Sequence, residues 1–288
     1  MPSLDEVLDL ADEKQEDIQE NLEKVLKQAE DVKREMDELN QEMLKQIQQK
    51  ELDWEEKKKL QDIMKQREEM QKQIDQVQQD LENLTEQLKE NDAISQETLE
   101  KYQELQELMQ QVKSPEFDAM QQRMQQAMEN VNPQEMQKMM EEMAFDEEKF
   151  KESIERTMKL LKRIQAEQKI DALAKRAEEL IKKMEETEKE LDNANPNDED
   201  KKNELANKQE SMKKDLDKMQ NELDELSETM QQLEEEELKN DVDNASESLN
   251  EEQSQEEMSK AKKNTQKGDM QQSKKNQQNA KKNVQKFA

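Results

Sequence analysis

Apolar residues recur over the first ninety positions in alternating steps of four and three. One run begins at Ile18 and a second at Leu60, with a break in phase at residues 52–56. This spacing is the a/d seam of a heptad repeat, along which two helices pack. The two runs are Ile18, Leu22, Val25, Ala29, Val32, Met36, Leu39, Met43 and Ile47, and then Leu60, Ile63, Arg67, Met70, Ile74, Val77, Leu81, Leu84 and Leu88.

Two such seams fit either one continuous rod with a stutter or an antiparallel hairpin, and the pairing of residues favours the hairpin. Residues whose numbers sum to 106, such as Val25 with Leu81, form layers that join an a position to a d position. The centre is then Asp53, which with Glu56 makes a capping box for a new helix. We predict a first hairpin over residues 1–91, with its turn near 51–54.

A second pair of seams lies between residues 173 and 233. Here the paired numbers sum to 396, as in Leu191 with Leu205 and Leu180 with Leu216. The centre, 198, falls in the segment 192–198 (DNANPND), which has the strongest turn composition in the chain. We predict a second hairpin over residues 146–239, with its turn near 192–199.

Residues 92–145 carry the signals of several short helices. Ser95, Ser114 and Asn132 are predicted N-caps, the last two followed by Pro at the first helical position, and Asp146 is predicted to cap the long helix after them. This segment is rich in Met, which either fills gaps in a core or forms an adaptable surface for partner helices. The methionines are Met109, Met120, Met124, Met128, Met136, Met139, Met140 and Met143.

Residues 240–288 keep only a thin apolar stripe at helical spacing. Gly268 and Asp269 indicate the end of one helix and the cap of the next. Because so sparse a stripe does not fold alone, we expect a polar tail that is partly disordered or made of short helices.

Composition narrows the fold class to all-α. The 288 residues include one Gly and four Pro, too few for the turns of a β or α/β fold. We therefore expect long antiparallel coiled-coil hairpins joined by short Met-rich helices, in an elongated molecule with a weakly ordered C-terminal tail. No apolar run exceeds three residues, so the sequence predicts no transmembrane segment, and its start has no signal-peptide pattern.

Charge is distributed unevenly. The net charge of −29 disfavours nucleic acid as a partner, but residues 260–287 hold nine Lys and one acid. Two uses of these lysines stay open. They either pair within the chain, above all with the adjacent acidic block 241–257, or bind anionic lipid or another polyanion.

Candidate chemistry is sparse. Without Cys or His the chain has no zinc site of the usual type, no thiol nucleophile and no Ser-His pair. The acidic turn at 192–200 lacks EF-hand spacing, and no P-loop motif occurs. We predict no catalytic, cofactor-binding or metal-binding residue, no cofactor and no enzyme activity. Trp54, at the predicted tip of the first hairpin, either anchors a partner or packs on the turn or the Met-rich helices.

A set of landmarks in this sequence resembles one family. In order these are Leu52-Asp53-Trp54-Glu55-Glu56-Lys57, Tyr102-Gln103-Glu104-Leu105-Gln106, Ser114-Pro115-Glu116, Phe145-Asp146-Glu147-Glu148 and the segment 155–169 (ERTMKLLKRIQAEQK). Over residues 40–240 the chain resembles the helical region of large bacterial membrane-anchored proteins defined by a domain of unknown function. The resemblance implies a cell-envelope setting on the periplasmic side and no established activity. The chain departs from the family in lacking its transmembrane start, which suggests a fragment of a longer protein.

These observations favour a non-enzymatic scaffold that mediates protein–protein interaction or self-association, as the soluble part of an envelope-anchored protein. Two alternatives remain. One is a holdase-like chaperone that grips clients with its hairpin arms, and the other is an adaptor that binds anionic lipid or polyanion through the Lys-rich tail.

Overall fold

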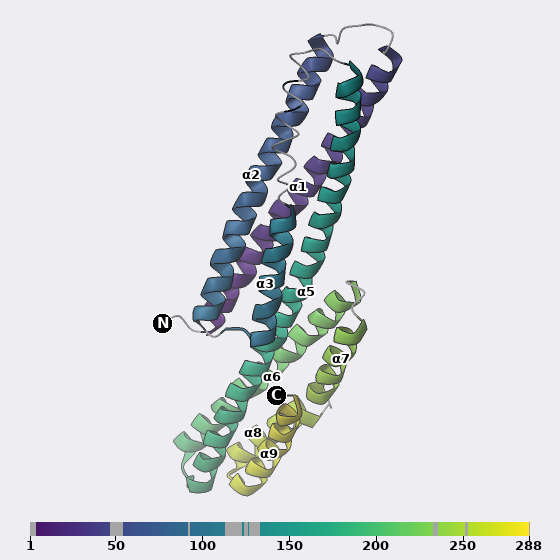
Figure 1. Ribbon diagram of the computed structural model, residues 1–288. Helices are drawn as coiled ribbons and strands as arrows, with labels where there is room; N and C mark the ends of the chain where they lie inside the picture. The colour runs from purple at the N-terminus through teal and green to yellow at the C-terminus, as the bar shows by residue number, and fades with distance from the viewer. Residues whose placement is uncertain are drawn as a thin grey trace. The chain divides into compact units, whose positions relative to one another are not determined.

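The computed structural model describes residues 4–46, 54–91, 93–112, 123, 126, 133–232, 236–250 and 253–287 (Figure 1). Within this described part every regular element is a helix, so the fold is all-α, as predicted. The helices are α1 (Leu4–Gln46), α2 (Trp54–Glu90), α3 (Gln96–Val112), α5 (Pro133–Asn193), α6 (Glu199–Gln232), α7 (Glu236–Asn250), α8 (Gln253–Lys267) and α9 (Met270–Phe287).

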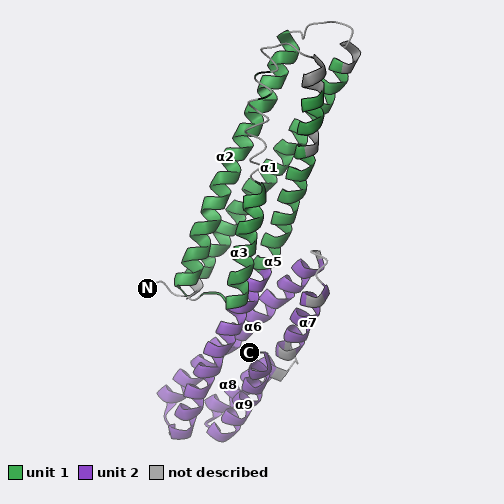
Figure 2. Ribbon diagram, in the orientation of Figure 1, with its two compact units in different colours: residues 1–165 green, residues 166–288 purple. Residues whose placement is uncertain are grey.

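The chain forms two compact units, residues 1–165 and 166–288 (Figure 2). Helix α5 contributes its first part to one unit and its last part to the other. This division differs from the predicted boundaries at 91/92, 145/146 and 239/240. The predicted N-cap at Asp146 is wrong, because α5 continues through it without a break. Residues 133–151 are mostly strong helix formers, which carry one interior Asp at small cost.

In the first unit, α1 and α2 pack against each other, and α3 packs on α2. The predicted cap at Ser95 is confirmed, since the Thr98 N–H donates to Ser95 Oγ over 3.1 Å. Tyr102 of α3 is fully buried, and its hydroxyl accepts a hydrogen bond from the Gln15 side chain of α1. The predicted caps Asp53, Ser114 and Asn132 lie outside the described residues, as do Met120, Met124 and Met128.

In the second unit, α6 packs on α7 and α8, and α8 packs on α9. The predicted turn before α6 is confirmed. Asn195 Oδ1 accepts from the Asn197 N–H, and Asp198 Oδ1 accepts from the Lys201 N–H, each over 3.0 Å. Asp198 is therefore the N-cap of α6, which leaves this turn short and well specified.

Polar contacts reveal the register of the second hairpin. Four ion pairs between described residues join α5 to α6, and one of them, Lys201 with Glu190 beside the turn, adds up to 391. In the other three the two residue numbers add up to 398: Arg176 with Glu222, Lys183 with Asp215 over 3.3 Å, and Glu190 with Lys208 over 2.7 Å. Every one of these residues precedes an a residue and so occupies a g position, where antiparallel helices exchange charges. The sum lies two above the predicted layer sum of 396, and Leu191 and Leu205 share one core cluster, as that layer sum requires.

The first hairpin has a different register from the predicted one. Its g-position contacts are Lys14 with Gln87 (2.9 Å), Glu35 with Gln66 (3.4 Å) and Glu42 with Lys59 (2.7 Å), and the numbers in each pair add up to 101. In the second hairpin the sum of 398 at the g contacts exceeds the sum at the core layers by two. The same difference in the first hairpin gives core layers whose residue numbers sum to 99. Val25 then faces Ile74 and not Leu81, a displacement of one heptad. The predicted sum of 106 is therefore wrong, because reversed heptads match equally well at every seventh residue.

The tail is helical where the structure describes it. The predicted stop at Gly268 is confirmed: its φ is +80°, its N–H donates to the Thr265 carbonyl, and the Asp269 N–H donates to the Asn264 carbonyl, each over 2.9 Å. This is a Schellman motif. Asp269 Oδ1 then accepts from the Gln272 N–H over 3.1 Å and caps α9.

A buried polar network explains why the tail folds despite its few apolar residues. Gln209 of α6 donates to Ser273 Oγ (2.9 Å) and Gln277 Oε1 (3.1 Å) of α9, and its own Oε1 accepts from Thr265 of α8 (2.8 Å). Gln277 in turn donates to the Met184 carbonyl of α5 over 2.6 Å. All four side chains are fully buried. Since the buried amides of Gln209 and Gln277 both have partners, these hydrogen bonds replace the missing apolar contacts at little desolvation cost.

Candidate functional site

Trp54 is the most exposed large apolar side chain that the structure describes. It is the first residue of α2, at the end of the first hairpin, and its side chain is 70% exposed. Lys58, one helical turn along, places its Nζ 5.4 Å from the ring centroid, a cation–π contact. Most of the Trp54 surface is therefore exposed in the described structure, and its use as an anchor for a partner stays a prediction. Leu10, near the start of α1, is the other exposed large apolar residue of the described part, at 45%.

A buried ion pair joins α2 to α5. Arg67 occupies an a position in the middle of the apolar seam of α2, and its Nε lies 3.0 Å from Oε2 of Glu147. Both side chains are almost completely buried, and the guanidinium lies 4.5 Å from the centroid of the Phe150 ring. Burial raises the pKa of Glu147 to about 7, an effect opposed by the Arg67 charge, and burial lowers the pKa of Arg67.

Ion pairs to α1 flank this buried pair. Glu148 pairs with Lys33, and Lys151 lies 2.9 Å from Glu30. The hydrogen bond from Lys33 lowers the pKa of Glu148. These side chains are partly exposed, so each pair contributes little stability by itself. With the Arg67–Glu147 pair they fix which face of α5 meets the α1/α2 hairpin.

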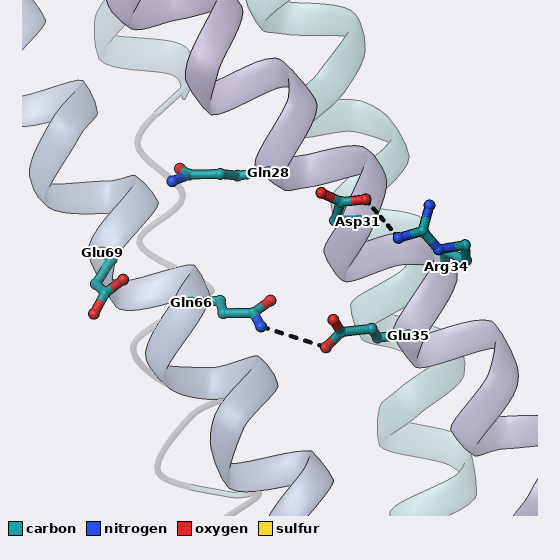
Figure 3. A pocket seen from close by; sticks show the side chains of 6 residues that line it. All are labelled: Gln28, Asp31, Arg34, Glu35, Gln66 and Glu69. Carbon is teal, nitrogen blue, oxygen red and sulfur yellow. Dashed lines mark hydrogen bonds and ion pairs between the residues drawn. The ribbon is translucent and has the colours of Figure 1, made fainter.

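A polar cleft lies between α1 and α2 (Figure 3). It is lined by Gln28, Asp31, Arg34 and Glu35 from α1 and by Gln66 and Glu69 from α2. Arg34 pairs with Asp31 over 2.6 Å, and Gln66 donates to Glu35 over 3.4 Å. Figure 3 shows the carboxylates spread along the helices rather than converging on one point. This arrangement is that of solvated helix faces, and it places no nucleophile beside a base.

The tail lysines divide into two groups. Four pair with acids: Lys262 with Glu210 (3.0 Å), Lys274 with Asp192 (2.6 Å), Lys281 with Glu188 (2.9 Å) and Lys260 with Glu257 (3.1 Å). Three of these acids belong to α5 or α6, so the acidic block at 241–257 is not the main partner. The other five lysines are exposed and form no ion pair within the part of the chain that the structure describes. They are Lys263, Lys267, Lys275, Lys282 and Lys286.

The two residues of the buried ion pair were not equally predictable from the sequence. Arg67 stood out as the one charged residue in an apolar seam. Its partner Glu147 did not, because α5 joins the hairpin from far along the chain.

A search of the described residues for a metal site finds no group of three or more acids or other ligand residues placed to hold a metal ion. No described helix combines the length and hydrophobicity needed to cross a bilayer.

Comparison with known proteins adds no relative. The chain matches no protein-family model, and neither a curated protein nor a solved structure is significantly similar to it. The function is therefore inferred from the geometry of the chain itself.

Proposed function

We propose that this chain is a non-enzymatic helical scaffold that contacts another protein through the end of its first hairpin. The carrying observation is Trp54, which exposes 70% of its surface at the first residue of α2. Trp is enriched among the residues that dominate binding energy at protein interfaces, because it buries a large rigid surface and still offers one N–H donor. The neighbouring Lys58 leaves one face of the ring already paired with a cation.

The uses of the buried charges also support a scaffold. Arg67, Glu147 and Phe150 hold helices together, and the Gln209 network docks the tail helices on α5 and α6. These polar groups contribute to the specificity of packing rather than to a reactive cleft. Met139, Met140 and Met143 of the Met-rich segment are buried. Because a holdase would grip its clients with exposed Met, these three residues give that alternative no support. The envelope setting rests on the sequence resemblance alone.

A site-specific cross-link tests this proposal. A photoreactive residue replaces Glu55, which is exposed beside Trp54. The labelled chain is irradiated in an extract of the source cells, once with Trp54 intact and once with Trp54→Ala. We expect at least one product that the wild type forms and the Trp54→Ala variant loses, while Leu10→Ala retains it. The purified partner is then titrated against the chain, and the fluorescence of its single Trp reports direct contact.

Two results would overturn the proposal. One is the absence of any product that depends on Trp54. The other is an equal loss with Leu10→Ala, since that residue is the matched exposed apolar side chain elsewhere in the first unit. A product that contains a second copy of the chain identifies self-association as the interaction, and sedimentation equilibrium of the wild type and Trp54→Ala then measures its strength.

A further inference from the structure

Helices α8 and α9 are two copies of one sequence pattern. Residues 253–267 align with residues 272–286 at a constant offset of 19, and eight of the fifteen positions are identical. The clearest part is AKKNTQK at 261–267 against AKKNVQK at 280–286. Gly268 and Asp269 form the turn between the two copies, which pack against each other as a helical hairpin (Figure 1).

Equivalent residues in the two copies have equivalent environments. Ala261 and Ala280 are fully buried, as are Ser254 and Ser273. Each buried serine accepts or shares a hydrogen bond from the opposite copy: Asn283 donates to Ser254 over 2.9 Å, and Ser273 lies 2.7 Å from the Thr265 hydroxyl. The inward half of the repeat therefore builds the hairpin.

Some lysines of the repeat form ion pairs and others are exposed without one within the described residues, at the same positions in both copies. The first of each Lys-Lys pair reaches an acid on a neighbouring helix, Lys262 to Glu210 of α6 and Lys281 to Glu188 of α5. The second, Lys263 or Lys282, lies on the side of its helix opposite the buried residues, and so does the last residue, Lys267 or Lys286. Internal packing thus requires the first lysine and makes no use of the others.

With Lys275, five exposed lysines lie on the outward sides of the two packed helices α8 and α9, and they are called the basic face below: Lys263, Lys267, Lys275, Lys282 and Lys286. Helix α9 contains no acidic residue, and within the described residues the nearest acids of α8 are already engaged. Glu256 and Glu257 both pair with Lys260, and Glu257 also accepts from Asn276 over 2.7 Å. Five exposed lysines without an ion pair in the described part therefore outnumber the acids left on this hairpin, which are one of the two carboxylates that share Lys260 and the exposed Asp269.

The chemistry of this face selects among anionic partners. Its remaining exposed side chains are polar, such as Gln266, Gln271 and Gln285, so a protein partner would find no apolar anchor. Arg is absent and Phe287 packs on the core, so nucleic acid would find neither a bidentate contact nor a stacking platform. A layer of anionic headgroups needs neither, because it binds clustered lysines through charge alone.

We infer that the basic face of α8 and α9 docks on the surface of an anionic membrane, lying on the headgroups without insertion. Since screening at physiological ionic strength acts over about 8 Å, the contact holds the lysines close to the lipid charges while the acids of the other helices are screened. Binding is electrostatic and so weakens steeply with salt. This inference is independent of the Trp54 interface, which lies in the other unit.

Vesicle sedimentation tests the inference with the full chain. Vesicles of phosphatidylcholine with about 30% phosphatidylglycerol are compared with vesicles of pure phosphatidylcholine at low and high salt. We expect binding to the anionic vesicles alone, and a loss of more than tenfold between about 50 and 500 mM salt. A variant with all five lysines changed to Gln is expected to lose binding more than tenfold, with unchanged helicity.

A matched control removes the same charge elsewhere. Lys24, Lys27, Lys65, Lys89 and Lys182 are exposed and form no ion pair in the described part of the chain, and their change to Gln is expected to leave binding within twofold. The inference is overturned if the wild type does not bind anionic vesicles, or if the control variant loses as much binding as the test variant. Binding to heparin or polyglutamate with none to vesicles would also overturn it, and would assign the face to a polyanion instead.

Discussion

Arg67 and Glu147 form an ion pair that is closed off from water inside a helical bundle. Their Nε and Oε2 atoms lie 3.0 Å apart, with 7% and 2% of the two side chains exposed. The pair occupies a site that heptad packing otherwise fills with an apolar residue. It is therefore the best place to measure what polar specificity costs this fold.

Removing one partner of this pair is expected to destabilise the protein strongly. Glu147→Ala at pH 8 leaves the Arg67 charge buried without its carboxylate, and we expect a loss of about 3–5 kcal/mol in the free energy of unfolding. The double variant Arg67→Met with Glu147→Met is expected to be close to the wild type or more stable. Urea denaturation followed by circular dichroism measures both. If the losses of Arg67→Met and Glu147→Met measured singly simply add in the double variant, the pair is not coupled and the assignment fails.

The same carboxyl gives stability a defined pH dependence. The pKa of Glu147 is raised from 4.5 to about 7 in the folded protein, so the folded state keeps its proton to higher pH than the unfolded state. The stabilisation is therefore complete below pH 4.5 and is lost as the pH rises through 7, a change of about 3 kcal/mol. We expect this loss in the difference between the wild type and Glu147→Gln, which cannot titrate there. A difference that is constant from pH 4.5 to 8 would contradict it.

Engineered disulfides test the register of the first hairpin. The chain has no Cys, so a pair of introduced cysteines gives an unambiguous product. We expect Val25→Cys to cross-link with Ile74→Cys under mild oxidation and not with Leu81→Cys. The second pair is displaced by seven residues, or about 10 Å along the helix, which exceeds the reach of a disulfide. Gel mobility without reductant reads out the result, and the reverse preference would restore the predicted sum of 106.

The turn between α8 and α9 depends on the only glycine of the chain. Gly268 has a φ of +80°, and a Cβ added there would meet the Pro196 carbonyl oxygen at 3.0 Å. We expect Gly268→Ala to cost about 1–2 kcal/mol, from the left-handed backbone and from this contact. Thermal denaturation measures the loss. The neighbouring variant Asp269→Ala, which removes only the cap of α9, is expected to cost about 1 kcal/mol.

Local and periodic signals predicted much of this fold. The all-α class follows from the scarcity of Gly, and the turn at Asp198 and the stop at Gly268 follow from residues whose preferences act within a few positions. In the second hairpin the strong turn also placed the heptads in register. In the first it did not, because Asp53 is a weaker marker and a seam shifted by seven residues buries the same side chains.

Tertiary contacts account for what the sequence could not indicate. The partner of Arg67 lies eighty residues away on α5, and no periodicity in α2 points to it. The order of the tail depends on Gln209, a single amide in α6 whose partners lie on α8 and α9. A polar residue in a seam predicts that some partner exists, and only the packed structure identifies that partner.

The charge contacts at g positions carry a consequence for how the hairpin arms can change length. A slip of one heptad keeps every residue at a g position but changes its partner. In the second hairpin Lys183 would then meet Lys208, or Glu190 would meet Asp215, so these contacts oppose a slip there. An indel of seven residues matched in both arms preserves every seam and every face. A single inserted residue rotates all that follow by 100° and moves the seam off its partner. Natural length variation in these arms is therefore expected in multiples of seven, with other lengths confined to the turns.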